Sequence, residues 1–118
     1  MTPIIFKTRD ELAKIDLDKM VYAEADGNYL YITMRNGLRL MVTIPLIQFE
    51  RLIENAVTEA NRGMYIRIGR KYIVDRRYIV QVSIPKQSLI LSDMATDKPV
   101  VLSVPKEALK ALKQTMTE

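Results

Sequence analysis

The strongest constraint on the fold is a hairpin signal around residue 36. Apolar and other side chains alternate over residues 29–34 (YLYITM) and again over residues 38–44 (LRLMVTI). Asn36-Gly37 lies between these runs and is typical of a type I′ turn, in which both central residues take positive φ. Two alternating runs joined by such a turn predict two antiparallel strands, each with one apolar face.

Similar short runs recur along the chain. Further strands are predicted at Pro3–Lys7, Lys19–Ala25, Tyr78–Ile84, Ser88–Ser92 and Val100–Val104, with turns at residues 26–28 and 85–87 and a loop over Ser92–Pro99. Thr8 and Glu11 have capping-box spacing, so we expect a helical turn over residues 9–14. Pro45 and Pro105 each open a helix. Apolar stripes of helical period follow both prolines: Leu46, Phe49, Leu52, Ile53 and Ala56 in the first helix, and Ala108, Leu109 and Leu112 in the second.

Composition narrows the function classes. A chain of 118 residues fits one domain, residues 1–118, and it contains neither cysteine nor histidine. These absences exclude disulfides, thiolate chemistry, most zinc sites and every Ser/His constellation. Glu24 and Asp26 would share one strand face, but such pairs are mostly turn acids. We therefore expect no enzyme, no cofactor and no metal site, and the lack of a signal peptide or of an apolar run of ~18 residues favours the cytoplasm.

Residues 62–78 (RGMYIRIGRKYIVDRRY), the basic stretch, are the most charged part of the chain. They contain six basic residues against the single acid Asp75, so the local charge of +5 exceeds the +4 of the whole chain. The basic residues are Arg62, Arg67, Arg70, Lys71, Arg76 and Arg77. Charges interleaved with β-formers are typical of a surface that meets phosphate, although a solvated face is the alternative.

A second group of polar side chains could contact nucleic acid. Asn28 and Tyr29 lie at a loop tip and can hydrogen-bond to base edges, Tyr31 can stack, and Lys106 at a helix start can bind phosphate. Alternatively, Asn28 is only a turn residue and the tyrosines cover a strand. A single-strand binder would use Tyr29, Tyr31 and Tyr72 as stacking platforms.

Four blocks, in order, carry a resemblance to the LytTR family of bacterial DNA-binding domains. They are MVYAEADGNYLYITMRNG (residues 20–37), LIQFERLI (46–53), YIRIGRKYIVDRRYI (65–79) and LSVPKEALKAL (102–112). The resemblance implies a mainly β fold, an elongated stack of small antiparallel sheets with two short helices. It also implies a transcriptional regulator that inserts loops into successive major grooves of double-stranded DNA. Pairs of such domains commonly act on repeated half-sites.

The resemblance also places the contacts. The hairpin-loop contact falls on Asn28 and Tyr29, the signature-loop contact on Arg70 and Lys71, and the last contact on Pro105 or Lys106. Together with the charges of the basic stretch, the expected DNA-binding residues are Asn28, Tyr29, Arg67, Arg70, Lys71, Arg76, Arg77 and Lys106.

The chain departs from the family signature at three positions. Gly69 replaces a histidine, Lys71 a serine and Asp75 an asparagine, and Asp75 is expected to place an anion beside the DNA-facing surface. These departures motivate an alternative, a module of the same fold that binds a regulatory protein partner and has weak or no DNA binding. The receiver domain that precedes most family members has no room in 118 residues, so we expect either a stand-alone regulator or an excised fragment, and the start at Met1 favours the former expectation.

Overall fold

The computed structural model of the chain describes residues 1–93 and 98–117, so residues 94–97 of the predicted Ser92–Pro99 loop lie outside the described residues. Contacts between residues divide the chain into two compact units, Met1–Asp75 and Arg76–Glu118. The first unit contains two antiparallel sheets and the second contains one, and each unit has one α-helix. The predicted mainly β fold class is therefore confirmed.

The first unit is built on a five-stranded antiparallel sheet with the strand order β5-β4-β3-β7-β6. Its strands are β3 (Met20–Asp26), β4 (Tyr29–Met34), β5 (Arg39–Val42), β6 (Tyr65–Ile68) and β7 (Tyr72–Asp75). Leu30, Ile32 and Met34 alternate along β4 and are all buried, as the sequence predicts. One face of this sheet therefore belongs to the core of the unit.

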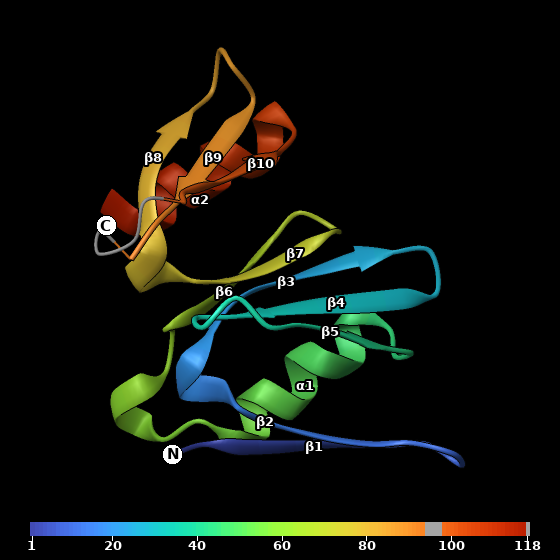
Figure 1. Cartoon of the computed structure of the whole chain (residues 1–118). Helices are drawn as coiled ribbons and strands as arrows, with labels where there is room; N and C mark the ends of the chain where they lie inside the picture. Colours follow the sequence, from blue (N-terminus) through green and yellow to red (C-terminus); the bar gives the residue numbers. More distant parts are fainter. Residues whose placement is uncertain (94–97, 118) are drawn as a thin grey trace. The chain divides into compact units, whose positions relative to one another are not determined.

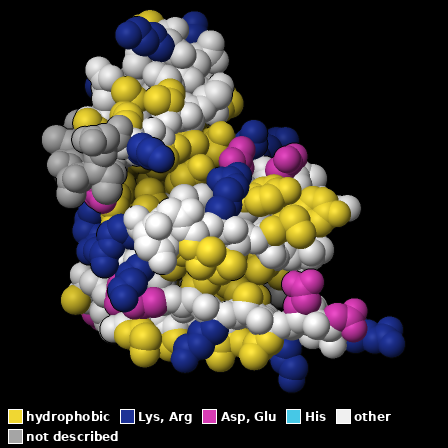
Figure 2. All heavy atoms as spheres, in the orientation of Figure 1, with side chains coloured by type: hydrophobic (Ala, Val, Ile, Leu, Met, Phe, Trp, Pro, Cys, Tyr) yellow, Lys and Arg dark blue, Asp and Glu magenta, His cyan; other side chains and the backbone are white. Residues whose placement is uncertain are grey.

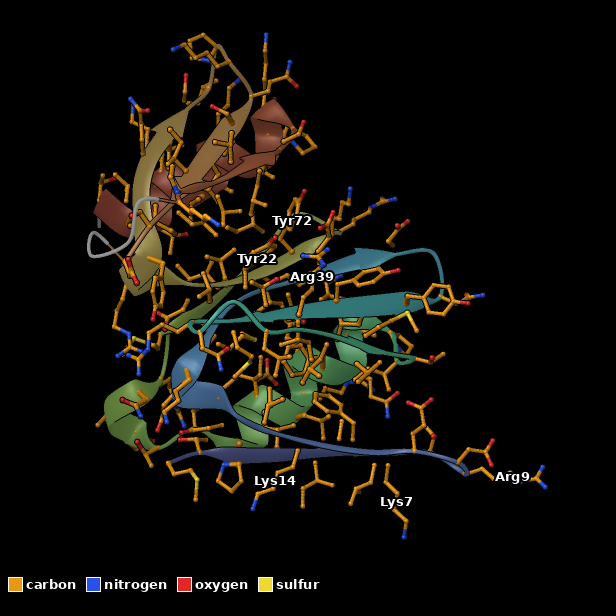
Figure 3. The ribbon with its side chains drawn as sticks, viewed as in Figure 1. Lys7, Arg9, Lys14, Tyr22, Arg39 and Tyr72 are labelled. Atoms are coloured by element: carbon orange, nitrogen blue, oxygen red, sulfur yellow. The ribbon has the colours of Figure 1, made fainter. Side chains whose placement is uncertain are left out.

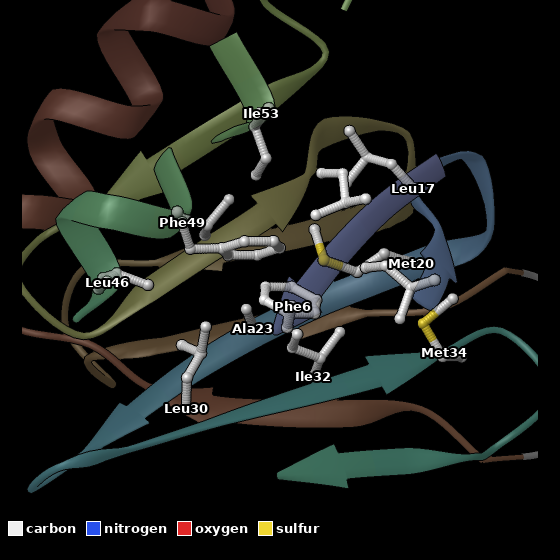
Figure 4. Packing of buried hydrophobic residues seen from close by; sticks show 13 residues of the cluster. Phe6, Leu17, Met20, Ala23, Leu30, Ile32, Met34, Leu46, Phe49 and Ile53 are labelled. Carbon is white, nitrogen blue, oxygen red and sulfur yellow. The ribbon is translucent and has the colours of Figure 1, made fainter. Parts of the chain in front are cut away.

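Two further layers complete this core. Strands β1 (Pro3–Lys7) and β2 (Leu12–Asp16) form a hairpin, and α1 (Leu46–Ala56) lies between it and the five-stranded sheet (Figure 1). Pro45 is the N-cap of α1, and the short 3-10 helices η1 (Leu17–Lys19) and η2 (Glu59–Asn61) lie in connections. The rings of Phe6 from β1 and Phe49 from α1 lie 5.5 Å apart in the core (Figure 4). The predicted stripe of α1 is confirmed, because its members are buried or pack against this core.

The helical turn expected over residues 9–14 is wrong. The Glu11 amide does donate to the Thr8 hydroxyl (3.1 Å), as in a capped helix, but the Thr8 amide also donates to the Glu11 carbonyl oxygen (2.9 Å). Both hydrogen bonds close the turn of the β1–β2 hairpin. An extended β2 puts Ile15 opposite Ile4 and buries both, whereas a helix of so few residues would bury little.

The hairpin at Asn36-Gly37 is confirmed, but its predicted turn type is wrong. Gly37 has a φ of 92°. Among the described residues, Gln87 is the only non-glycine residue with a positive φ, so Asn36 lacks the positive φ that a type I′ turn requires. The Met34 amide donates to the Leu38 carbonyl oxygen, and the Gly37 amide donates to that of Met34. This pattern is a three-residue loop with glycine in the left-handed position. The Asn36 side chain accepts a hydrogen bond from the Leu38 amide (3.0 Å).

The second unit is a three-stranded antiparallel sheet with a C-terminal helix. After the short 3-10 helix η3 (Arg76–Tyr78) come β8 (Ile79–Ser83), β9 (Ser88–Leu91), β10 (Val100–Ser103) and α2 (Lys106–Thr117), with the strand order β10-β9-β8. Leu109 and Leu112 of α2 are buried and Lys106 is exposed, so the predicted orientation of this helix is confirmed.

Candidate nucleic-acid interface

The β3–β4 loop is the first of two loops that present predicted site residues. It consists of Gly27 and Asn28, because Asp26 pairs with Tyr29 across the hairpin. Gly27 has a φ of 60°, which matches a type II′ turn with glycine at the first central position. Asn28 is exposed and Tyr29 is 46% exposed. The loop therefore presents an amide and a phenol to solvent.

The β6–β7 loop consists of Gly69, Arg70 and Lys71, because Ile68 pairs with Tyr72. Gly69 has a φ of 59°, a conformation that other residues adopt at a cost. Glycine adopts this conformation without strain, and Gly69 is one of the three positions at which the chain departs from the signature. Arg70 and Lys71 are exposed. The Arg70 side chain makes no ion pair or hydrogen bond with any residue in ranges 1–93 and 98–117.

Both loops emerge at the same end of the five-stranded sheet. Strand β7 runs antiparallel to β3 with Tyr72 opposite Glu24, so the start of β7 lies beside the end of β3 (Figure 1). The Ala25 amide donates a hydrogen bond to the Lys71 carbonyl oxygen at 2.8 Å. We call this end of the sheet the two-loop end. It carries Asn28, Tyr29, Arg70 and Lys71.

Glu24 lies next to the two-loop end and binds two cations. Its carboxylate oxygens are 3.2 Å from the Lys71 ammonium and 3.3 Å from the Arg39 guanidinium. Arg39 also donates hydrogen bonds to the hydroxyl groups of Tyr22 (3.1 Å) and Thr33 (3.0 Å). Tyr22, Arg39 and Tyr72 lie on the face of the sheet opposite α1 (Figure 3). We call this group the Glu24 network.

Three groups near Glu24 have shifted pKa values. The hydrogen bond to Glu24 raises the pKa of Lys71. Burial disfavours the charge of Arg39, but hydrogen bonds to Tyr22 and Glu24 outweigh burial and raise the pKa of Arg39. Burial, followed by the charge of Glu24, raises the pKa of Tyr72. Both cations are charged and the phenol is protonated at neutral pH, and the shifts stabilise these protonated forms further.

Arg67 contacts α1. Its Nη1 atom lies 3.1 Å from the Glu50 carboxylate, and its Nε–H donates to the Gly69 carbonyl oxygen at 3.3 Å. The Arg67 side chain is 29% exposed, so this pair is partly shielded from water. Arg67 therefore joins β6 to α1 and supports the β6–β7 loop, whereas its contact with DNA stays a prediction.

Strand β7 lies between β3 and β6 in the sheet, and all four of its residues, Tyr72–Asp75, are buried. Asp75 is 0% exposed, and no buried side-chain oxygen or nitrogen in the described part of the chain lacks a hydrogen-bond partner. The expectation that Asp75 places an anion beside the DNA-facing surface is wrong. Tyr72 is 4% exposed, so its expected role as a stacking platform is also wrong.

The remaining predicted DNA-binding residues, Arg76, Arg77 and Lys106, belong to the second unit, where they lie in two separate places. Arg76 and Arg77 belong to η3, which precedes β8, and Arg77 interacts with other groups of the protein. Lys106 is the first residue of α2. Because the strands alternate in direction, the end of β10 lies beside the β8–β9 turn, where the Val104 amide donates to the Gln87 carbonyl oxygen at 3.0 Å. Lys106 and the two arginines therefore lie at opposite ends of this sheet.

Arg39 was missed by the sequence reasoning, and Glu24 was considered only as a partner of Asp26. Alternation along the strands places both residues on the face away from the core, with Glu24 opposite Tyr31 and Arg39 opposite Thr33. That signal was available in the sequence. The ion pair was not, because it depends on the register of strands distant in the chain.

No group of three or more metal-ligating side chains is close enough to hold an ion within residues 1–93 and 98–117. Among the same residues, no helix is both long and apolar enough to cross a bilayer.

Comparisons with known proteins bear on the fold. Neither a protein-family model nor a curated protein sequence matches the chain. Among solved structures, the chain is similar to the LytTr DNA-binding domain of a methyl-accepting/DNA response regulator from Bacillus cereus, with a TM-score of 0.68 and 19% sequence identity. The similarity covers 100% of this chain and 99% of that chain. The chain therefore has the fold of a LytTr DNA-binding domain, as the four sequence blocks predict.

Proposed function

We propose that this chain binds double-stranded DNA as the DNA-binding domain of a bacterial transcriptional regulator in the cytoplasm. The observation that carries the proposal is the two-loop end, where Asn28, Tyr29, Arg70 and Lys71 lie together on two tight turns. Amide and guanidinium groups on such turns can form directional hydrogen bonds with base edges in a major groove. The LytTr fold supports the same function.

The second unit supplies additional positive charge. Arg76, Arg77 and Lys106 contact phosphate in this proposal, and contacts of that kind fix the position of a protein on the duplex without reading its sequence. Two copies of the chain bind repeated half-sites. Gel filtration and light scattering of complexes with one and with two half-sites measure this stoichiometry.

The function is tested by selecting bound fragments from a genomic duplex library and then titrating the recovered sequence by mobility shift. We expect one recurrent sequence, bound more tightly than its scrambled version and than its single strands. A selection that recovers no sequence above background would refute sequence-specific duplex binding. Preference for the single strand in competition would favour a stacking mode instead.

Individual contacts are tested by alanine substitution. Arg70→Ala should weaken binding by about 1 to 3 kcal/mol if Arg70 reads a base, with lower discrimination at one position of the site. If Arg70 contacts phosphate, the loss should be equal across sequences. Arg62→Ala is the matched control, because Arg62 pairs with Glu59 at 3.1 Å on an exposed surface and its loss removes the same charge.

A second candidate function is protein binding, and the outer side of the β1–β2 hairpin favours it. Ile5 is 57% exposed and Leu12 is 69% exposed there. Lys7 and Lys14 also lie on this outer side, where hydrophobic and basic side chains alternate (Figures 2 and 3). Exposed apolar groups beside charges are typical of interfaces with other proteins. This function predicts that Ile5→Asp abolishes partner binding while charge reversal of Arg70 and Lys71 leaves it unchanged.

A further inference from the structure

Side-chain contacts connect the two loops of the two-loop end across the sheet. Tyr29 lies next to Tyr31, with ring centroids 6.5 Å apart, and the Arg39 guanidinium lies over the Tyr31 ring at 4.8 Å. Arg39 pairs with Glu24, and Glu24 pairs with Lys71. The contacts therefore run without interruption from the β3–β4 loop to the β6–β7 loop.

Glu24 is the central group of this connection, because its two carboxylate oxygens bind cations from opposite directions. Arg39 comes from β5, which is separated from β3 by β4, whereas Lys71 precedes β7 on the other side of β3. The Glu24 side chain is 21% exposed, so water screens these pairs only in part. Lys71 keeps a 53% exposed side chain, which leaves ammonium protons available for a ligand.

We propose that Glu24 is a positioning residue for DNA recognition, which fixes the β6–β7 loop relative to the β3–β4 loop and withholds the charge of Lys71 from phosphate. The inference rests on the proposed DNA-binding function. An ammonium that is neutralised within the protein adds little to the sequence-independent attraction for phosphate. It can still donate a hydrogen bond to a base acceptor in a fixed direction. Glu24 therefore favours discrimination between sequences over affinity for any duplex.

The experiment replaces Glu24 by glutamine, which keeps the shape of the side chain and removes its charge. Glu59→Gln is the matched control, because it changes the net charge equally and removes the exposed Arg62 pair. Binding to the selected duplex and to its scrambled version is measured by fluorescence anisotropy between 50 and 200 mM salt. Circular dichroism and thermal unfolding establish that both variants are folded.

Three results are expected for Glu24→Gln relative to Glu59→Gln. Affinity for the scrambled duplex rises about two- to fivefold, the range for a pair of this exposure. The plot of log K against log salt steepens by about 0.9, because one more cation reaches phosphate. Preference for the selected duplex falls, because the sequence-independent part of binding grows. Adding Lys71→Gln to Glu24→Gln should return the salt slope to the wild-type value, whereas slopes and preferences equal to those of Glu59→Gln would overturn the proposal.

A second experiment, without DNA, tests whether Glu24 connects the two loops. Arg39→Gln should shift the amide NMR resonances of Gly69 and Arg70 in the wild-type chain and leave them in place when Glu24→Gln is already present. Arg51→Gln, an exposed change on α1, is the control and should not shift them. Equal effects of Arg39→Gln in both backgrounds would refute the connection through Glu24. If the wild-type chain binds no duplex, the proposed function is refuted, and so is the claim that Glu24 withholds the charge of Lys71 from phosphate. The NMR experiment still decides whether Glu24 links the two loops.

Discussion

The salt dependence of DNA binding measures how many basic residues contact phosphate, and the structure predicts fewer contacts than the number of basic residues in the sequence. If all six cations of the basic stretch contacted phosphate, log K against log salt would have a slope of about −5.4, from a coefficient of about −0.9 per phosphate. In the structure, Arg62 pairs with Glu59, Arg67 with Glu50 and Lys71 with Glu24. These three cations are therefore opposed by carboxylates, and Arg77 also interacts with other groups of the protein.

The expected slope follows from the cations that are not opposed in this way. Arg70 and Arg76 of the basic stretch, together with Lys106, have no opposing carboxylate among residues 1–93 and 98–117. They would release counterions from three phosphates and give a slope of about −2.7. The measurement is fluorescence anisotropy of a labelled duplex between 50 and 200 mM potassium chloride. Arg70→Gln should reduce the steepness of the slope by about 0.9, whereas Arg62→Gln should leave it unchanged.

Three outcomes would refute this reasoning. A slope near −5.4 would mean that the ion pairs with Glu50, Glu59 and Glu24 open on binding, so that they do not determine which cations meet DNA. A slope near zero would refute DNA binding itself. An equal loss of slope in Arg70→Gln and Arg62→Gln would show that net charge, rather than the position of Arg70, determines the attraction.

Three further predictions concern stability, each measured by urea unfolding. Phe49→Ala should lower the free energy of unfolding by about 3 to 5 kcal/mol, because Phe49 is fully buried against Phe6, and a loss below about 1 kcal/mol would contradict that packing. Gly69→Ala should cost about 1 kcal/mol because of its φ of 59°, whereas Gly→Ala at a position of negative φ is neutral or stabilising. The Thr2 amide hydrogen bond lowers the pKa of Asp16 below 3.8, so this carboxylate stabilises the fold above pH 3.8 and that contribution is lost as pH falls through the lowered value. Asp16→Ala should therefore cost about 1 kcal/mol at pH 7 and less as pH falls below 3.8, and a constant cost would contradict the assignment.

Local patterns predicted the strands well because the information lies in neighbouring residues. Alternation over residues 29–34 coincides with β4, and the apolar stripe after Pro45 coincides with the buried side of α1. Thr8 and Glu11 failed because their hydrogen bonds suit both a helix start and a hairpin turn. The hairpin forms in place of the helix because Ile4 and Ile15 are both buried only if their two segments are extended.

The candidate site was harder to predict because it depends on contacts between distant residues. Asn28 and Arg70 are 42 positions apart in the sequence and lie at one end of the sheet only because β7 pairs with β3. Arg67 and Arg70 have similar neighbours in the sequence, yet Arg67 binds Glu50 of α1 and Arg70 faces solvent. No periodicity within residues 62–78 distinguishes these two arginines.

The fate of the basic stretch follows from the position of β6 and β7 in the sheet. Strand β7 is an inner strand whose four residues are all buried, so Asp75 lies in the interior of the protein. Strand β6 lies at the sheet edge beside α1, and its arginine is used to hold the helix. The turn between them is exposed and cannot be buried by either strand. The sheet therefore divides the basic stretch: the turn residues Arg70 and Lys71 stay exposed, while the residues of β6 and β7 stabilise the fold that presents them.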